Sequence, residues 1–174
     1  MALETALLIV PPKEVQVFSY PLRSEYDSEA FDNKLPAHLT LLYPFVPPEM
    51  VESAIDKLNQ VCSNIRPFEM TLDHYGRFDD AIYLAPSDPE PVLALFRMLA
   101  SEFPEYPVYE GEHGDELHPH LTLARFGSSA EEKAIELPPE PRFTFTVDKI
   151  HLSLGSTEDD TPFIPRAVIA LNGK

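Results

Sequence analysis

The chain has 174 residues, which is enough for one ordinary domain with its own hydrophobic core. Its net charge of −16 argues against tight binding to long nucleic acid, which needs a surface rich in Lys and Arg. The apolar fraction of 44% and the charged fraction of 24% are ordinary for a soluble globular protein.

The spacing of apolar residues, together with the prolines that separate periodic segments, predicts the helices and strands of the first half of the chain. A helix over residues 49–65 is the clearest of them, because its apolar residues recur at spacings of three and four. Pro21 interrupts an earlier helical stretch. In chain order we expect a buried strand at 5–10, a helix at 13–24, a polar loop at 26–36, a strand at 38–45 and the helix at 49–65.

The second half of the chain repeats strands and helices, with an acidic loop at residues 104–117. Several strands follow one another directly, which indicates antiparallel sheets and an α+β fold rather than a doubly wound parallel sheet. The predicted strands are 68–78, 81–85, 120–126, 143–154 and 165–171, and the predicted helices are 91–103 and 128–137.

The only cysteine is Cys62, which lies in the helical stretch 49–65. One thiol cannot form an internal disulfide, so we expect a reducing, cytoplasmic environment and a structural role for Cys62. The N-terminal residues lack the basic region of a signal peptide, and no apolar run approaches the roughly 20 residues that span a bilayer. We therefore expect no membrane partner, and a monomer is the simplest oligomeric state.

One tetrapeptide occurs twice, as His38-Leu39-Thr40-Leu41 and as His120-Leu121-Thr122-Leu123. Each copy alternates polar and apolar residues, which is the period of a strand with one wet and one buried face. The imidazole and the hydroxyl of each copy therefore point the same way. Two such strands facing each other would place two imidazoles and two hydroxyls around one cleft, a set suited to acid-base chemistry on a phosphate ester.

The two motifs resemble those of the 2H phosphoesterase superfamily, most closely its 2′-5′ RNA ligase-like, cyclic phosphodiesterase branch. The second motif continues with Ala124-Arg125, which is especially similar to that branch, and the later segment Val147-Asp148-Lys149-Ile150-His151-Leu152 resembles a family strand. The resemblance implies one domain over residues 1–174, made of two lobes with pseudo-two-fold symmetry. Two antiparallel sheets would enclose a central groove, and helices would lie outside.

The resemblance also implies metal-independent, cofactor-free opening of 2′,3′-cyclic phosphodiesters on small nucleotides or short RNA ends. By analogy, His38 is the acid and His120 the base, although the residues alone leave this order open. Thr40 and Thr122 would donate hydrogen bonds to the non-bridging phosphate oxygens. Some family members join RNA ends through a 2′-5′ bond by the reverse reaction.

Four further residues are candidates for binding the substrate. Arg125 offers a charge-assisted clamp for phosphate, although strict strand alternation places it on the side of the core leucines. Tyr43 offers a stacking surface for a base. A third match of similar form, His151-Leu152-Ser153-Leu154, lies too close to the second motif for the half-chain symmetry, so His151 and Ser153 are minor candidates for the groove wall.

Two other classes of function remain open from the sequence. One is a binding module that holds a phosphorylated nucleotide without turnover. The other is a metal-dependent hydrolase, since an acidic loop runs into the second motif. A solvated charge run explains that loop better, because no second ligand cluster accompanies it. The loop residues concerned are Glu112, His113, Asp115, Glu116 and His118.

Overall fold

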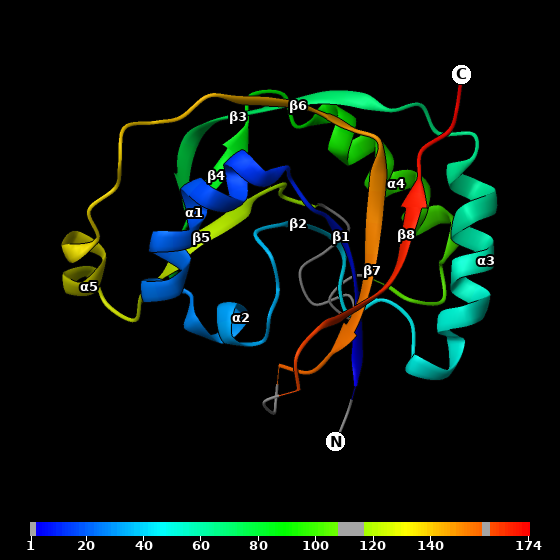
Figure 1. Cartoon of the computed structure of the whole chain (residues 1–174), viewed down its shortest axis with the longest axis horizontal. Helices are drawn as coiled ribbons and strands as arrows, with labels where there is room; N and C mark the ends of the chain where they lie inside the picture. Colours follow the sequence, from blue (N-terminus) through cyan, green and yellow to red (C-terminus); the bar gives the residue numbers. More distant parts are fainter. Residues whose placement is uncertain (1–2, 108–116, 158–160) are drawn as a thin grey trace.

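The structure is a computed structural model that describes residues 3–107, 117–157 and 161–174. The described strands pair only in antiparallel fashion and form two four-stranded sheets (Figure 1). The strands are β1 (Glu4–Ile9), β2 (Leu39–Leu42), β3 (Phe68–Arg77), β4 (Ala81–Pro86), β5 (Leu121–Arg125), β6 (Phe143–Val147), β7 (Lys149–Gly155) and β8 (Ile164–Ala170). The first sheet has the order β2-β1-β7-β8 and the second β5-β4-β3-β6, which confirms the α+β prediction.

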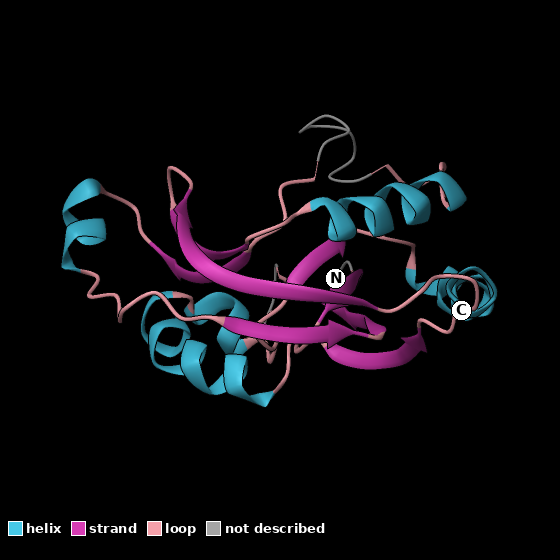
Figure 2. Cartoon of the chain, turned by 90° about the horizontal axis from the view of Figure 1, so that it is seen from above, coloured by secondary structure: helices cyan, strands magenta, loops and turns pink. Residues whose placement is uncertain are grey.

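Helices flank the strands on the outside, as Figure 2 shows from above. In the first sheet, α3 packs against β8, whereas α1 crosses to pack against β5 of the second sheet. Among the described residues, no helix is both long and apolar enough to cross a membrane. The helices are α1 (Lys13–Tyr26), α2 (Ser28–Asp32), α3 (Val51–Cys62), α4 (Glu90–Glu102) and α5 (Ser129–Ala134), and a 3₁₀ turn, Pro48–Met50, leads into α3.

The region around α1 and α2 differs from the prediction. Helix α1 continues through Pro21 to Tyr26, because Pro21 lies on an exposed face where the unpaired carbonyl one turn earlier can bond to water. The stretch 26–36, expected to be a loop, contains the short helix α2. A five-residue helix buries too little apolar surface to leave a periodic pattern in the sequence.

The single long strand predicted over residues 143–154 is wrong. The chain forms two strands there, β6 and β7, and they belong to different sheets. Asp148 separates them, and β6 pairs with β3 while β7 pairs with β1 and β8. The apolar positions change phase there, from residues 143, 145 and 147 to residues 150, 152 and 154. A phase change fits a bulge within one strand as well as a break between two, so the pattern alone did not show the change of sheet.

The two motif strands occupy corresponding places in the two sheets. Each is an edge strand, β2 beside β1 and β5 beside β4, and the two edges contact each other. The C-terminal strands β7 and β8 complete the sheet that the N-terminal strands begin, so neither sheet corresponds to one half of the chain.

Leucines from both sheets fill one continuous hydrophobic core. Leu7 and Leu39 reach it from the first sheet, and Leu84 and Leu121 from the second. This shared core holds the two sheets together. Cys62 is fully buried in the same core, and burial raises the pKa of its thiol to about 11, which fits the structural role expected for it.

Leu152 provides a test of this core. It is fully buried on β7, between its partners Leu7 on β1 and Ala167 on β8. Leu152→Ala should lower the free energy of unfolding by about 2–5 kcal/mol, because the substitution leaves a cavity that the sheet cannot close. Urea denaturation measures the change. Val168→Ala on β8, where the side chain is 55% exposed, should cost less than about 0.5 kcal/mol, and equal losses for the two variants would contradict this account of the core.

Candidate active site

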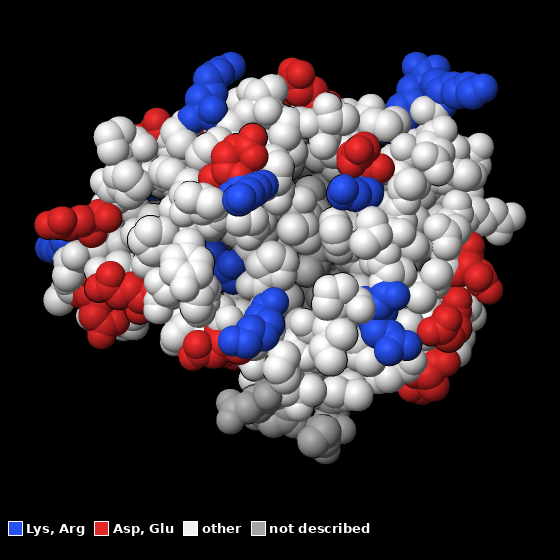
Figure 3. All heavy atoms as spheres, viewed as in Figure 1, with Lys and Arg blue, Asp and Glu red and all other residues white. Residues whose placement is uncertain are grey.

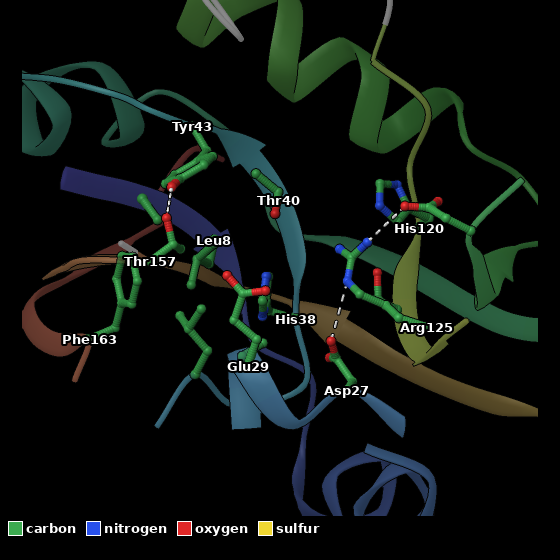
Figure 4. Close-up of a pocket in the computed structure, with 15 residues that line it drawn as sticks. Leu8, Asp27, Glu29, His38, Thr40, Tyr43, His120, Arg125, Thr157 and Phe163 are labelled. Atoms are coloured by element: carbon green, nitrogen blue, oxygen red, sulfur yellow. Dashed lines mark hydrogen bonds and ion pairs between the residues drawn. The ribbon is translucent and has the colours of Figure 1, made fainter. Parts of the chain in front are cut away.

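A cleft of about 460 Å³ opens beside β2 and β5 (Figure 4). Both histidines and both threonines of the repeated motif line it, so the structure brings His38, Thr40, His120 and Thr122 together. The two histidines directly precede their strands rather than lying within them. On each strand the threonine side chain lies on the face that borders the cleft, as the alternation predicts.

Each imidazole ring is held by a hydrogen bond from its Nδ1 to the backbone carbonyl two residues earlier in the chain. His38 Nδ1 donates to the carbonyl of Pro36 at 2.7 Å, and His120 Nδ1 donates to the carbonyl of His118 at 2.6 Å. A carbonyl only accepts, so Nδ1 carries the proton in each ring. Each Nε2 is therefore the atom left to accept or donate a proton in the cleft.

Burial keeps both rings neutral. It lowers the pKa of His38 to about 4, against the opposing effect of the Pro36 carbonyl and with the help of the positive charge of Arg23. Burial also lowers the pKa of His120, and the hydrogen bond to His118 opposes that shift. Near neutral pH the lowered pKa values favour the uncharged form of both imidazoles.

Each motif strand contains a β-bulge, and the two bulges match. On β2, Leu8 pairs with Thr40 and Leu7 with Leu42, so Leu41 has no partner. On β5, Leu123 is left without a partner in the same way. A bulge turns two successive side chains to one face, and each strand accordingly buries two residues in a row.

The bulges decide where Tyr43 and Arg125 lie. These residues occupy the same place in their motifs, five positions after the histidine, and both line the cleft. Strict alternation would have sent Arg125 to the core side, and the extra residue on β5 returns it to the side of Thr122. The sequence could not show this, because a bulge depends on the pairing with the neighbouring strand.

Two carboxylates hold Arg125. Its Nε lies 3.4 Å from Asp27 Oδ1, and its Nη1 lies 3.5 Å from Asp80 Oδ2. Asp27 is buried, and its other oxygen lies 3.5 Å from Arg23 Nε. Burial raises the pKa of Asp27, and both arginines oppose that shift. Arg23 also donates to the carbonyl of Leu35 at 2.8 Å, which ties the chain after α2 to α1.

Tyr43 marks the opposite, apolar end of the cleft, as Figure 4 shows. Its hydroxyl donates to Glu4 Oε2 at 2.6 Å, and burial together with this bond raises the pKa of Tyr43 to about 12. Leu8, Leu35 and Phe163 line the same end and belong to a small apolar cluster apart from the main core. One end of the cleft thus carries the guanidinium of Arg125, and the other has apolar walls.

Aromatic residues that the sequence did not single out hold the second motif. The rings of Phe78 and Tyr83 lie 4.9 and 5.5 Å from that of His120, in edge-to-face geometry. Tyr83 also shares a hydrogen bond of 2.8 Å with His118 Nε2. A Cβ on Gly76 would lie 2.3 Å from the Tyr83 ring, so only glycine leaves room for that ring. The Gly76-Tyr83 pairing was invisible in the sequence because the strand register creates it.

The two minor candidates lie outside the cleft lining. His151 and Ser153 are on β7, and β1 separates them from the motif strand β2. His151 pairs with Leu8 and Ser153 with Ala6. Leu8 and Ala6 are the residues that reach the cleft in their place.

The loop considered as a metal site lies mostly outside the described residues, which omit Glu112, His113, Asp115 and Glu116. Of the stretch, His118 and His120 are described. Among the residues that the structure describes, no group of three His, Cys, Asp or Glu side chains has an arrangement able to hold a metal ion.

Comparison with known proteins gives a consistent result. A family model described as the 2′-5′ RNA ligase superfamily matches residues 11–159. A protein of Geobacillus kaustophilus, named provisionally as a phosphoesterase, is 26% identical over 153 residues, which cover 84% of each chain. A protein of Bacillus anthracis with the same provisional name is 28% identical over 133 residues, covering 74% of this chain and 73% of the relative.

Solved structures share the fold. E. coli LigT complexed with 3′-AMP aligns with a TM-score of 0.73 at 23% identity, covering 98% of this chain and 99% of that one. A protein of Thermus thermophilus aligns over 100% of both chains with a TM-score of 0.65 at 20% identity. LigT has also been crystallised with ATP and with NADP+.

The state of the two imidazoles can be measured directly. NMR titration of the free protein should give pKa values below 6.5 for both His38 and His120, with that of His38 near 4. Inorganic phosphate should raise both values, because an anion in the cleft favours the imidazolium form. The ring resonances of His74, which is exposed on β3 outside the cleft lining, are the internal control and should keep their positions when phosphate is added. Free-protein values at or above 6.5 would contradict the burial argument.

Proposed function

Because the chain belongs to the 2′-5′ RNA ligase superfamily, we propose that it is a metal-independent phosphodiesterase with two-histidine catalysis. Its substrates are 2′,3′-cyclic or related cyclic phosphodiesters of small nucleotides or short RNA ends. One observation carries the proposal: two imidazoles with identically fixed tautomers share a cleft with two threonine hydroxyls and one arginine.

The proposed reaction opens the cyclic ester with water. One imidazole takes a proton from water through Nε2 as the water oxygen bonds to phosphorus, and the partner gives a proton to the ribose oxygen as its bond to phosphorus breaks. We assign His120 as the base and His38 as the acid, following the family resemblance. With the 5′-hydroxyl of a second RNA end in place of water, the same two proton transfers would form a bond from that oxygen to phosphorus and break the bond to the ribose 3′-oxygen. This step would join the two ends through a 2′-5′ phosphodiester, which is the second candidate activity.

The remaining polar groups suit the charge that builds on phosphorus. The hydroxyls of Thr40 and Thr122 can donate to the non-bridging oxygens, and Arg125 can add a charge-assisted bond. A bound phosphate would raise the imidazole pKa, because its negative charge favours the protonated form of one ring. On the face shown in Figure 3, the described Lys and Arg residues lie singly or in small groups, several of them beside Asp or Glu, and do not form a continuous band that could follow a long strand.

The first test is turnover. With EDTA present, the protein should convert 2′,3′-cyclic nucleotides to 2′- or 3′-monophosphates, followed by phosphorus NMR. His38→Ala and His120→Ala should each lower kcat/KM by about 10²–10⁴-fold, because each removes one proton-transfer group. Both variants should still bind the monophosphate product.

His74→Ala is the matched control, since it removes an exposed imidazole outside the cleft and should leave turnover unchanged. A wild-type protein that binds nucleotides without converting any of them would be a binding module instead. Activity that appears only after a divalent metal is added would indicate a metal-dependent hydrolase.

The pH dependence follows from the direction of the two shifts. Productive enzyme needs one imidazole protonated and the other neutral, and both free-enzyme pKa values are lowered. The maximum of kcat/KM should therefore lie below pH 6.5, since this quantity reports the free enzyme. The maximum of kcat should lie higher, because bound phosphate raises the imidazole pKa. A kcat/KM that rises between pH 6.5 and 8 would contradict the two-histidine mechanism.

A further inference from the structure

Helix α2 brings a carboxylate into the cleft that the proposed mechanism does not use. Glu29 lines the cleft and points into it from α2 (Figure 4). The other two acidic residues of the lining, Asp27 and Asp80, are both paired with Arg125. In the part of the chain that the structure describes, neither a hydrogen bond nor an ion pair occupies the Glu29 carboxylate. A carboxylate in this state is a free acceptor for a ligand.

The two ends of the cleft differ in what they can hold. Arg125 stands at one end, and the two histidines and two threonines fix where phosphorus lies. At the other end, Leu8, Leu35 and Phe163 form apolar walls beside the ring of Tyr43. Apolar and aromatic walls suit the faces of a nucleobase and do not suit a second phosphate.

The polar groups at this apolar end are acceptors rather than donors. The O–H groups of Tyr43 and Thr157 both donate hydrogen bonds to Glu4 Oε2, at 2.6 and 3.3 Å, so each hydroxyl oxygen is left to accept. Glu29 adds two carboxylate oxygens. A nucleobase that enters this end would face hydrogen-bond acceptors of the protein. Nucleobases with donor groups on the facing edge are therefore favoured over those with acceptor groups there.

Guanine is the base that matches this edge. Its N1–H and its exocyclic amine are adjacent donors, and together they fit the two oxygens of one carboxylate. Adenine and cytosine each place an acceptor nitrogen beside their amine, and uracil flanks its single N–H with two carbonyls. We infer that Glu29 determines base specificity and that the cleft selects guanosine cyclic phosphates. This inference rests on the proposed phosphodiesterase function and names its substrate.

The experiment compares kcat/KM for the 2′,3′-cyclic phosphates of guanosine, adenosine, cytidine, uridine and inosine. Wild-type protein should prefer guanosine over adenosine by about tenfold, the scale of one bidentate contact. Inosine, which lacks the exocyclic amine, should fall between the two. Glu29→Gln should bring guanosine and adenosine within about twofold of each other, since an amide offers one acceptor and one donor.

Asp32→Asn is the matched control. Asp32 is exposed on the same helix, lies outside the cleft lining, and loses the same charge. This variant should keep the guanosine preference, and both variants should melt within a few degrees of the wild type. Equal kcat/KM values for all bases, or a guanosine preference that survives Glu29→Gln, would overturn the inference and leave the phosphodiesterase proposal intact.

A binding measurement separates the two failures. Calorimetric titration with guanosine 3′-monophosphate and adenosine 3′-monophosphate needs no turnover. If no cyclic nucleotide is converted, the proposed function fails. In that case, a guanosine preference in binding that Glu29→Gln abolishes would still uphold the role of Glu29, and equal binding would reject it.

Discussion

One unpaired residue in each of two edge strands determines which side chains reach the cleft. A regular strand alternates its faces, so the residue five positions after each histidine would point toward the core. Leu41 and Leu123 interrupt this alternation, and the next exposed positions, Tyr43 and Arg125, turn back to the cleft. Without the bulges the site would hold imidazoles and hydroxyls but no cation, and a guanidinium would face an apolar interior at a large desolvation cost. Both strands contain the bulge, but the side chain that it turns toward the cleft is Tyr43 after β2 and Arg125 on β5.

Because one bulge places Tyr43 and the other Arg125, the two ends of the cleft differ in charge. A cluster of charged side chains, partly buried, holds Arg125 in place. Arg125 forms an ion pair with Asp27, and the buried Asp27 forms a second ion pair with Arg23 of α1. A buried ion pair is weak evidence for stability, because desolvation offsets much of the attraction. Its clearer consequence is geometric. Asp27 lies between α1 and α2 and touches β5 through Arg125, so the orientation of the cationic end depends on how α1 packs against β5.

Sequence patterns predicted how the motif side chains are placed better than they predicted the surroundings of those side chains. The repeated tetrapeptide placed His38 and Thr40 on one side because strand alternation is local, and a strand needs no partner to express it. The bulges, the change of sheet at Asp148 and the place of Gly76 under an aromatic ring all depend on which strands pair, and pairing is decided by residues far apart in the chain. Helix α2, which carries Glu29, is too short to leave a periodic signal. What sequence missed is therefore the part that distinguishes one end of the cleft from the other.

The charges of the cleft indicate how much negative charge a ligand can bring. Burial favours the neutral form of both imidazoles, Arg125 is already shared between two carboxylates, and Glu29 adds a negative charge of its own. At physiological salt, charges more than about 8 Å away are largely screened, so these nearby groups matter more than the net charge of −16. A phosphodiester carries one negative charge, and protonation of a single imidazole balances it. A second phosphate at the Tyr43 end would meet acceptors and a carboxylate instead of a cation, so the site is matched to a ligand with a single charge.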